Sequence, residues 1–305
     1  MIRKTTAALA ALVCLVGLGA CSNPEDSAAG KEQQTNSDAI VEKVQKDDTV
    51  AELLPEDIRS KGGFAAAINA DFAPIKFVDA DGKITGLNPD LLRAAAKVLG
   101  TEVKFQEGTF DSMVPGLEAK RFDVIASVGD FVERQKKIDF IDYMKAGTAI
   151  MAHKGVKQDE VTADTLCGLS IGYTRGSAQQ AFLEEAAKKC EAAGQPALEP
   201  RPYQDSGAGI LSVKSAQDDA FWGDSPQVVY NVEQHPDLYK TIFNETNIVY
   251  GIGIHKDNTN LRDALRAALL KLVETGVYEK LLAAWKQQDL ALPEMPINSD
   301  ISQEG

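Results

Sequence analysis

The chain has 305 residues, 44% of them hydrophobic and 25% charged, and its formal net charge at pH 7 is −13. This length suits one large domain or two smaller ones. The acidic balance argues against a nucleic-acid partner, because a phosphate backbone would be repelled by it.

The first residues have the pattern of an export signal. Arg3 and Lys4 precede an apolar stretch over residues 7–20, which is too short to span a bilayer as an ordinary helix. Small residues then lead to Cys21 in an arrangement that resembles the lipobox of bacterial lipoproteins. The resemblance implies that residues 1–21 are a lipoprotein signal, that Cys21 is lipidated, and that the lipid anchors the protein to the outer face of the cell membrane. The alternative is an ordinary signal in which Cys21 has no role.

A polar segment separates this signal from the first element of the fold. Residues 22–49 are rich in small and polar side chains, which build no core, so we predict a flexible tether there. The ordered chain is expected to begin near Val50 and to end near residue 292, with a tail over residues 293–305.

Strand-like apolar runs then alternate with helical patterns, which favours an α/β fold with mostly parallel sheet. The first unit has strands over 63–69, 103–106 and 123–127 and helices over 88–99 and 111–120. Asn88 is expected to cap the first helix, with Pro89 at its first position.

A second unit repeats this alternation. It has strands over 169–173, 201–203 and 219–222 and helices over 177–193, 207–213 and 226–233. Ser177 and Gln180 form a predicted capping box at the start of the first of these helices. Extended stretches over 148–153 and 248–255 lie between the units, and each is expected to cross from one unit to the other.

Two units joined by two crossings indicate two lobes around a cleft. Helices follow the second crossing and are expected to complete lobe 1, which then comprises residues 50–147 and 254–292, with lobe 2 at 148–253. A cleft that closes by hinge motion encloses a small solute. The sequence has no H-E-x-x-H, G-x-S-x-G or C-x-x-C pattern, so we expect no catalysis, no cofactor and no metal site.

Two cysteines remain as a pair once Cys14 is assigned to the signal and Cys21 to the lipid anchor. The strand over 169–173 leads away from Cys167, and the helix that follows returns over a similar length to Cys190. We therefore predict a disulfide between Cys167 and Cys190, and two buried free thiols are the alternative.

Seven segments resemble one known family when they are taken together and in this order. They are ADFAPIKF (70–77), DGKITGLNPDLLRAAAKVLG (81–100), FDSMVPGLEAKRFDVI (110–125), ERQKKIDFIDY (133–143), GYTRGSAQQ (172–180), DDAFWGDSP (218–226) and YGIGIHKDNTNLRDAL (250–265). The family is the family 3 solute-binding proteins of ABC importers, in the polar amino-acid binding class, and the likeness spans about residues 50–290.

This resemblance implies a type II periplasmic-binding-protein-like fold, with two wound mixed sheets joined by a two-strand hinge. It also implies a monomer that captures an amino acid between its lobes and delivers it to a membrane permease. Two alternatives on the same fold are a dehydratase-like enzyme and a periplasmic-type ligand sensor.

The resemblance also assigns ligand contacts. Arg134 matches the arginine that holds the α-carboxylate, since a planar guanidinium bonds a carboxylate twice. Asp224 matches the acid that takes the α-ammonium, and Ser177 lies at a helix N-terminus that also faces the carboxylate. Phe72 is expected to stack on the ligand. The other predicted cleft residues of this group are Asn69, Phe110 and Ser127.

Two further charged residues bear on the side chain of the ligand. Asp130 stands where the family usually has serine or threonine, so it either pairs with Arg134 or meets a cationic group of the ligand. Arg175 is placed to meet an acidic side chain. Asp71 and Asn69 act in the same direction as Asp130, and together they favour a basic or neutral polar amino acid over glutamate.

Overall fold

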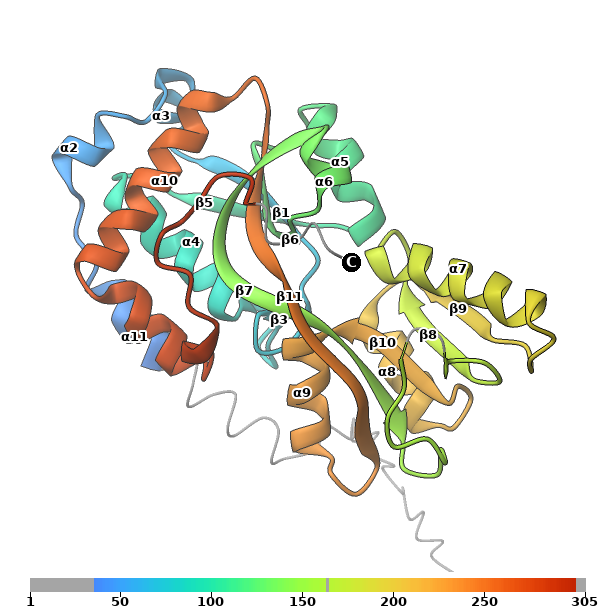
Figure 1. The fold of residues 1–305 in the computed structure, drawn as a ribbon. Coiled ribbons are helices and arrows are strands. Elements are labelled where there is room, and N and C mark those ends of the chain that lie inside the picture. Colours follow the sequence, from blue (N-terminus) through green and yellow to red (C-terminus); the bar gives the residue numbers. More distant parts are fainter. Residues whose placement is uncertain (1–35, 163–164, 300–305) are drawn as a thin grey trace, which may run out of the picture.

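The computed structural model describes residues 36–162 and 165–299 (Figure 1). The predicted export signal, with Cys14 and Cys21, and the predicted tether up to residue 35 lie outside these residues. Among the described residues, no helix combines the length and the apolar character needed to cross a membrane.

The larger lobe contains the N-terminal half of the fold and the C-terminal helices. Its elements before the first crossing are α2 (Asp48–Ala51), α3 (Glu56–Lys61), β1 (Phe64–Ile68), β2 (Asp71–Phe72), β3 (Lys76–Val78), β4 (Ile84–Thr85), α4 (Leu87–Val98), β5 (Val103–Glu107), α5 (Phe110–Glu118), β6 (Val124–Gly129) and α6 (Val132–Gln135). β1 pairs in parallel with β5 on one side and with β6 on the other. α10 (Thr259–Glu274) and α11 (Val277–Ala284) pack beside α4 and are followed by a 3-10 turn, η2 (Gln288–Leu290).

Side chains of the strands in this lobe pack alternately toward two apolar layers, because successive residues of a strand point to opposite faces of the sheet. In β1, Phe64 and Ile68 pack into the layer formed by α4, α10 and α11, whereas Ala67 packs against Met113 of α5. With both faces covered, the carboxyl ends of the parallel strands β1 and β6 open at one edge of the sheet, where ligands of α/β proteins usually bind.

The smaller lobe lies between the two crossings. Its elements are β8 (Ser170–Thr174), α7 (Ala178–Ala192), β9 (Glu199–Tyr203), α8 (Ser206–Lys214), β10 (Ala220–Asp224) and α9 (Ser225–Gln234). β8 pairs in parallel with both β9 and β10. α7 covers one face of this sheet through Leu183 and Ile171, and α8 and α9 cover the other face around Phe221.

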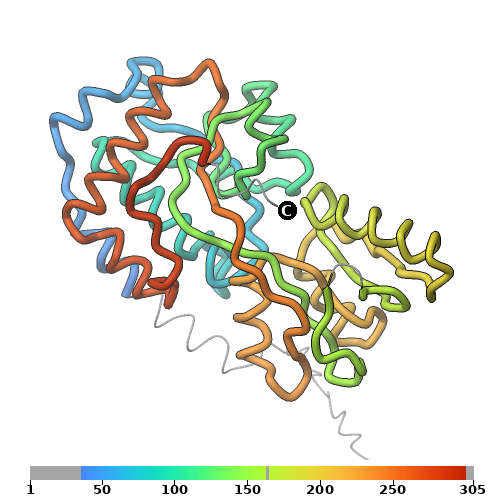
Figure 2. Tube along the Cα trace, viewed as in Figure 1, coloured from blue at the N-terminus to red at the C-terminus, as the bar shows by residue number. Residues whose placement is uncertain are grey.

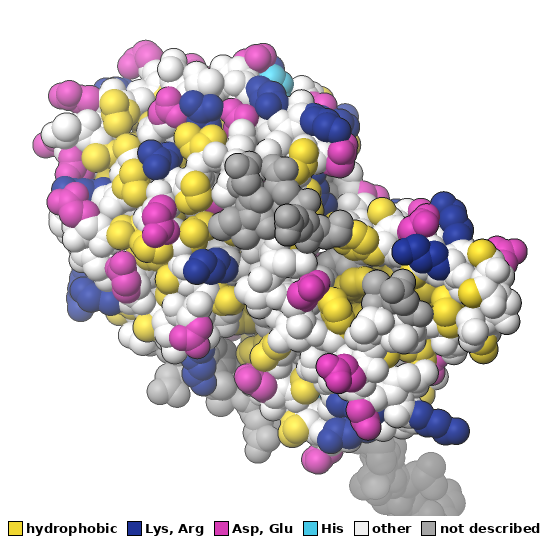
Figure 3. Space-filling model, viewed as in Figure 1, with side chains coloured by type: hydrophobic (Ala, Val, Ile, Leu, Met, Phe, Trp, Pro, Cys, Tyr) yellow, Lys and Arg dark blue, Asp and Glu magenta, His cyan; other side chains and the backbone are white. Residues whose placement is uncertain are grey.

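Two long strands connect the lobes. β7 (Ile138–His153) and β11 (Tyr239–His255) pair antiparallel and lie side by side from one lobe to the other (Figure 2). Hydrogen bonds therefore join all the principal strands in the order β5-β1-β6-β11-β7-β10-β8-β9. The predicted two-lobed α/β fold with a two-strand hinge is confirmed. On the face seen in Figure 3, charged side chains of both signs are interspersed over the two lobes.

One helix start differs from the prediction. Asn88 does not cap α4, because the helix begins at Leu87 with Gly86 as its N-cap at a φ of 120°. The Asn88 amide instead donates a hydrogen bond to the carbonyl of Ala126 at 2.6 Å, inside the core. A Cβ at Gly86 would lie 2.5 Å from the carbonyl oxygen of Ile75, so only glycine fits this turn.

Parts of the predicted tether and of the predicted tail pack on the larger lobe. Val41 and Met295 are buried in its core. Ile297 forms a bridge with Ile141 of β7, and the N–H of Ser299 donates to the carboxylate of Asp142 at 3.0 Å. The sequence did not predict this packing, because both segments are polar overall and only a few apolar side chains attach them to the core.

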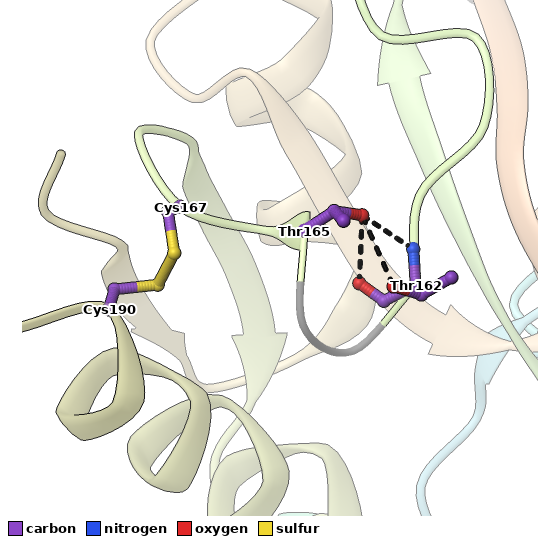
Figure 4. The surroundings of a disulfide bond; sticks show 4 residues. All are labelled: Thr162, Thr165, Cys167 and Cys190. Carbon is purple, nitrogen blue, oxygen red and sulfur yellow. Dashed lines mark hydrogen bonds between the residues drawn. A yellow bond between two sulfur atoms is a disulfide. The ribbon is translucent and has the colours of Figure 1, made fainter. Parts of the chain in front are cut away.

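The predicted disulfide between Cys167 and Cys190 is present (Figure 4). The two Cα atoms are 5.6 Å apart and the cysteines are 23 positions apart in sequence. The bond joins the C-terminal part of α7 to the segment that leads into β8, so it ties this end of the helix to the start of the strand.

We expect the double substitution Cys167→Ala and Cys190→Ala to lower the free energy of unfolding by about 3 kcal/mol. The reason is that the disulfide closes a loop between cysteines 23 positions apart, which restricts the unfolded chain. Urea titration monitored by circular dichroism measures the difference. The reduced wild type, which keeps both side-chain volumes, is the control for packing. Iodoacetamide labelling of both cysteines in unreduced, denatured wild type would contradict the prediction.

Candidate functional site

A cavity between the lobes is lined by residues from both. The larger lobe contributes the carboxyl ends of β1 and β6 and the strand β2, and the smaller lobe contributes the starts of α7, α8 and α9. Seven of the nine predicted contact residues line it, and they are Asn69, Phe72, Phe110, Ser127, Arg134, Ser177 and Asp224. Asp130 and Arg175 do not line this cavity.

Arg134 is held between two aromatic rings of the larger lobe. The central carbon of its guanidinium lies 5.3 Å from the ring centre of Phe110 and 5.1 Å from that of Phe131. Nη1 donates to the carbonyl of Gly129 at 2.8 Å, which is its one side-chain hydrogen bond within the described residues. Burial lowers the pKa of Arg134 to about 10, so the guanidinium stays charged at neutral pH. A stacked, charged guanidinium with unused donors is suited to bind a carboxylate.

Asp224 enters the cavity from the smaller lobe. It occupies the N-cap position of α9, but its carboxylate makes no hydrogen bond to the helix amides. Instead, Oδ1 accepts a hydrogen bond from Nε2 of Gln179 at 3.2 Å. Burial raises the pKa of Asp224, and Tyr250, Lys76, Gln179 and Arg134 act in the opposite direction. A carboxylate that is hydrogen-bonded by a neutral amide and not by a cation is suited to accept an ammonium group.

The start of α7 presents an unused hydroxyl to the cavity. The predicted capping box forms only in part, because Gln180 accepts from the N–H of Gly176 at 3.1 Å while the Ser177 side chain makes no cap bond. The buried Oγ of Ser177 has no hydrogen-bond partner in the part of the chain that the structure describes. This hydroxyl and the first N–H groups of the helix together form a set of donors for an anion.

Two of the predicted residues already form hydrogen bonds with neighbouring side chains in the floor of the cavity. Oγ of Ser127 shares a hydrogen bond of 2.8 Å with the hydroxyl of Tyr143. Nδ2 of Asn69 donates to Oδ1 of Asp71 at 2.7 Å. These bonds fix the side chains at the ends of β1 and β6, so the floor is organised before any ligand is considered.

The lobes touch at Asp71, so the structure is a closed arrangement. Oδ2 of Asp71 accepts from the backbone N–H and the hydroxyl of Ser206 at 3.1 and 3.0 Å. The Asp71 carbonyl accepts from Nε2 of Gln227 at 3.4 Å. These bonds join β2 of the larger lobe to the starts of α8 and α9.

The position of Asp130 corrects the cleft role predicted for it. Its side chain is fully buried, and both carboxylate oxygens accept from Nε2 of Gln135, at 2.9 and 3.0 Å. Burial and the nearby carboxyl of Asp142 raise the pKa of Asp130 to about 7. The loop after β6 thus turns Arg134 into the cavity and Asp130 toward β7. Arg175 is exposed just after β8 and also lies outside the cavity.

Several cavity residues were not predicted from the sequence. They are Lys76, Phe131, Thr174, Gln179, Ser206, Trp222, Gln227, Ile248 and Tyr250. A signal existed for Lys76, which is a lysine between the apolar residues Ile75 and Phe77. Over residues 36–162 and 165–299, no cluster of His, Cys, Asp and Glu is arranged to hold a metal ion.

The family model that describes bacterial extracellular solute-binding proteins, family 3, matches residues 64–288. The arginine-binding protein ArgT of Corynebacterium glutamicum is 28% identical over 296 residues, which cover 94% of this chain and 95% of that protein. The histidine-binding periplasmic protein of Escherichia coli is 26% identical, with coverage of 75% of this chain and 86% of that protein.

Solved structures of two ancestral proteins have the same fold. An ancestral arginine-binding protein bound to arginine has a TM-score of 0.66 and 28% identity, covering 73% of this chain and 98% of that one. An ancestral amino acid-binding protein, a precursor of cyclohexadienyl dehydratase, has a TM-score of 0.67 and 26% identity, covering 75% and 98%.

We expect Asp130→Asn to raise the free energy of unfolding at pH 8 by on the order of 4 kcal/mol and to have little effect at pH 4. The pKa of Asp130 is about 7 in the folded protein, above its ordinary value. The folded state therefore keeps a proton that the unfolded state releases, and this stabilisation is lost as the pH rises toward 7. Asparagine resembles the protonated acid at every pH.

Urea titrations at both pH values measure this difference. Asp237→Asn, which removes an exposed carboxylate, is the matched control. Equal changes in the free energy of unfolding at pH 4 and pH 8 would show that the buried carboxyl of Asp130 does not hold a proton.

Proposed function

We propose, from the fact that the chain belongs to family 3 of the bacterial extracellular solute-binding proteins, that it captures an α-amino acid between its lobes. One observation carries the proposal. A guanidinium of the larger lobe, on Arg134, and a carboxylate of the smaller lobe, on Asp224, line the same cavity. A zwitterion is the small solute that compensates both charges at once, and it does so only when the lobes are closed.

The arrangement of donors and acceptors suggests how the ligand is oriented. Its α-carboxylate binds the guanidinium of Arg134 and the start of α7, where the Ser177 hydroxyl has no partner within the described residues. Its α-ammonium binds Asp224, which accepts from the neutral amide of Gln179. The ligand then lies against the ring of Phe72, and its side chain extends toward β2 and β3. Charge-assisted hydrogen bonds of this kind are about twice as strong as neutral ones.

We further propose that the protein is the lipid-anchored binding subunit of an ABC importer. The pattern that ends at Cys21 supports the anchor, and the family supports delivery of the solute to a membrane permease. The contacts of Asp71 with Ser206 and Gln227 hold the closed form, and the permease must break them to release the ligand.

A dehydratase-like enzyme needs an acid or base beside the leaving group of its substrate. Asp130 does not supply it, because this residue lies outside the cavity. Asp224 does line the cavity, but in the proposed arrangement it binds the α-ammonium. A sensor role uses the same closed form with a receptor in place of the permease.

We expect Arg134→Lys and Asp224→Asn each to lower the affinity for the amino-acid ligand by about 100-fold. Lysine keeps the charge but cannot bond the α-carboxylate twice, and asparagine leaves the α-ammonium without an anionic partner. Mass spectrometry of the solute retained through purification identifies the ligand, and calorimetry measures its affinity. Arg175→Lys, the same exchange at an exposed site, is the control and should bind normally. Recovery of a sugar or a metal complex, equal affinities of the Arg134 and Arg175 variants, or turnover of the ligand would refute the proposal.

A further inference from the structure

A lysine of the larger lobe, Lys76, is buried in the wall of the cavity beside two aromatic rings. Lys76 is only 2% exposed, and its Nζ lies 5.2 Å from the ring centre of Phe72 and 5.9 Å from that of Phe110. Nζ donates hydrogen bonds to Oδ1 of Asn69 and to the carbonyl of Ser127. An ammonium group has three donors, so one N–H of Lys76 has no acceptor among the described residues.

The acids that face Lys76 are already engaged elsewhere. Asp71 of β2 accepts from Asn69 through Oδ1 and from Ser206 through Oδ2. Asp224 at the end of β10 accepts from Gln179. Neither carboxylate forms an ion pair within 4 Å of Lys76 in the described chain, although both act on its charge. The ammonium is therefore compensated only at a distance, which is costly for a buried charge.

Lys76 remains charged at neutral pH in these surroundings. Burial lowers its pKa to about 8, and Arg134 of α6 acts in the same direction, while Asp71 and Asp224 oppose the change. The formal charges of the side chains that line the cavity sum to zero, because two are acidic and two are basic: Asp71, Asp224, Lys76 and Arg134. The two α-groups of an amino acid also sum to zero, so a cationic ligand side chain adds an uncompensated positive charge beside Lys76.

We propose that Lys76 determines which side chain is accepted, and that the preferred ligand is an α-amino acid whose side chain ends in a carboxylate or carboxamide. This inference rests on the proposed function. The free N–H of Lys76 donates to the terminal oxygen of such a side chain, and a guanidinium or ammonium side chain is repelled. This preference replaces the one for a basic or neutral polar amino acid that the sequence predicted from Asp130, Asp71 and Asn69. Asp130 lies outside the cavity, and Asp71 is engaged in the contact between the lobes.

Calorimetry with glutamate, glutamine, arginine, lysine and norvaline tests this inference. Norvaline has an aliphatic side chain, so it reports the α-group site alone. We expect wild type to bind glutamate or glutamine about 100-fold more tightly than arginine or lysine. Lys76→Met should lower the affinity for the preferred ligand, relative to that for norvaline, by about 10-fold or more. Lys104→Met, the same exchange at an exposed position of β5, is the matched control.

A pH series on wild type gives a readout that needs no variant. Affinity for glutamate relative to norvaline should fall as the pH rises from 7 to 9, because Lys76 loses its charge over this interval while the α-groups of the two ligands titrate alike. Two results would overturn the role of Lys76 and leave amino-acid binding intact. One is tighter binding of arginine or lysine than of glutamate and glutamine. The other is a ratio of glutamate to norvaline affinity that changes neither with pH nor in Lys76→Met. Failure of every amino acid to bind would instead overturn the proposed function.

Discussion

The antiparallel pairing of β7 with β11 is the contact through which each lobe is attached to the other. Both strands continue into the two lobes and pair there with β6 and β10. Asp224 ends β10 and Arg134 follows β6 in α6, so both side chains reach the cavity between the lobes. The pairing is irregular near its middle, where the register shifts between Glu245 and Ile248. Gly147 lies at this point, and a Cβ there would come within 1.9 Å of the Glu245 carbonyl oxygen. The absence of a side chain at residue 147 therefore lets the two crossing strands approach.

The cavity contains charges of both signs that do not neutralise one another directly. Each is held by neutral groups instead, Arg134 by a carbonyl and two rings, and Asp224 by the amide of Gln179. Direct ion pairs between them would satisfy the protein and leave nothing for a solute. Keeping them apart costs stability, and the closed lobes regain that free energy only when a ligand of matching charge lies between them.

The sequence predicted the order of the main elements, because strand and helix periodicities are strong over residues 63–127 and 169–233. It did not predict β2 and β4, since two residues are too few to show a period. It also placed Arg134 and Asp130 in one site, because only four positions separate them. In the structure the loop directs the two side chains to opposite sides. Gln135 fixes Asp130 by a hydrogen bond and is itself bonded to the carbonyl of Ser299, far along the chain. Contacts of this kind set the side-chain directions in the loop, and no local sequence pattern predicts them.

The larger lobe draws on both ends of the chain, whereas the smaller lobe is built from the segment between the crossings. Val41, near one end, and Met295, near the other, share one buried core with α4, α10 and α11. During synthesis the smaller lobe has all of its strands and helices before the larger lobe has received α10. The lobe that holds Arg134 is thus finished last, and a chain interrupted at any point before its final turns has an incomplete hydrophobic core.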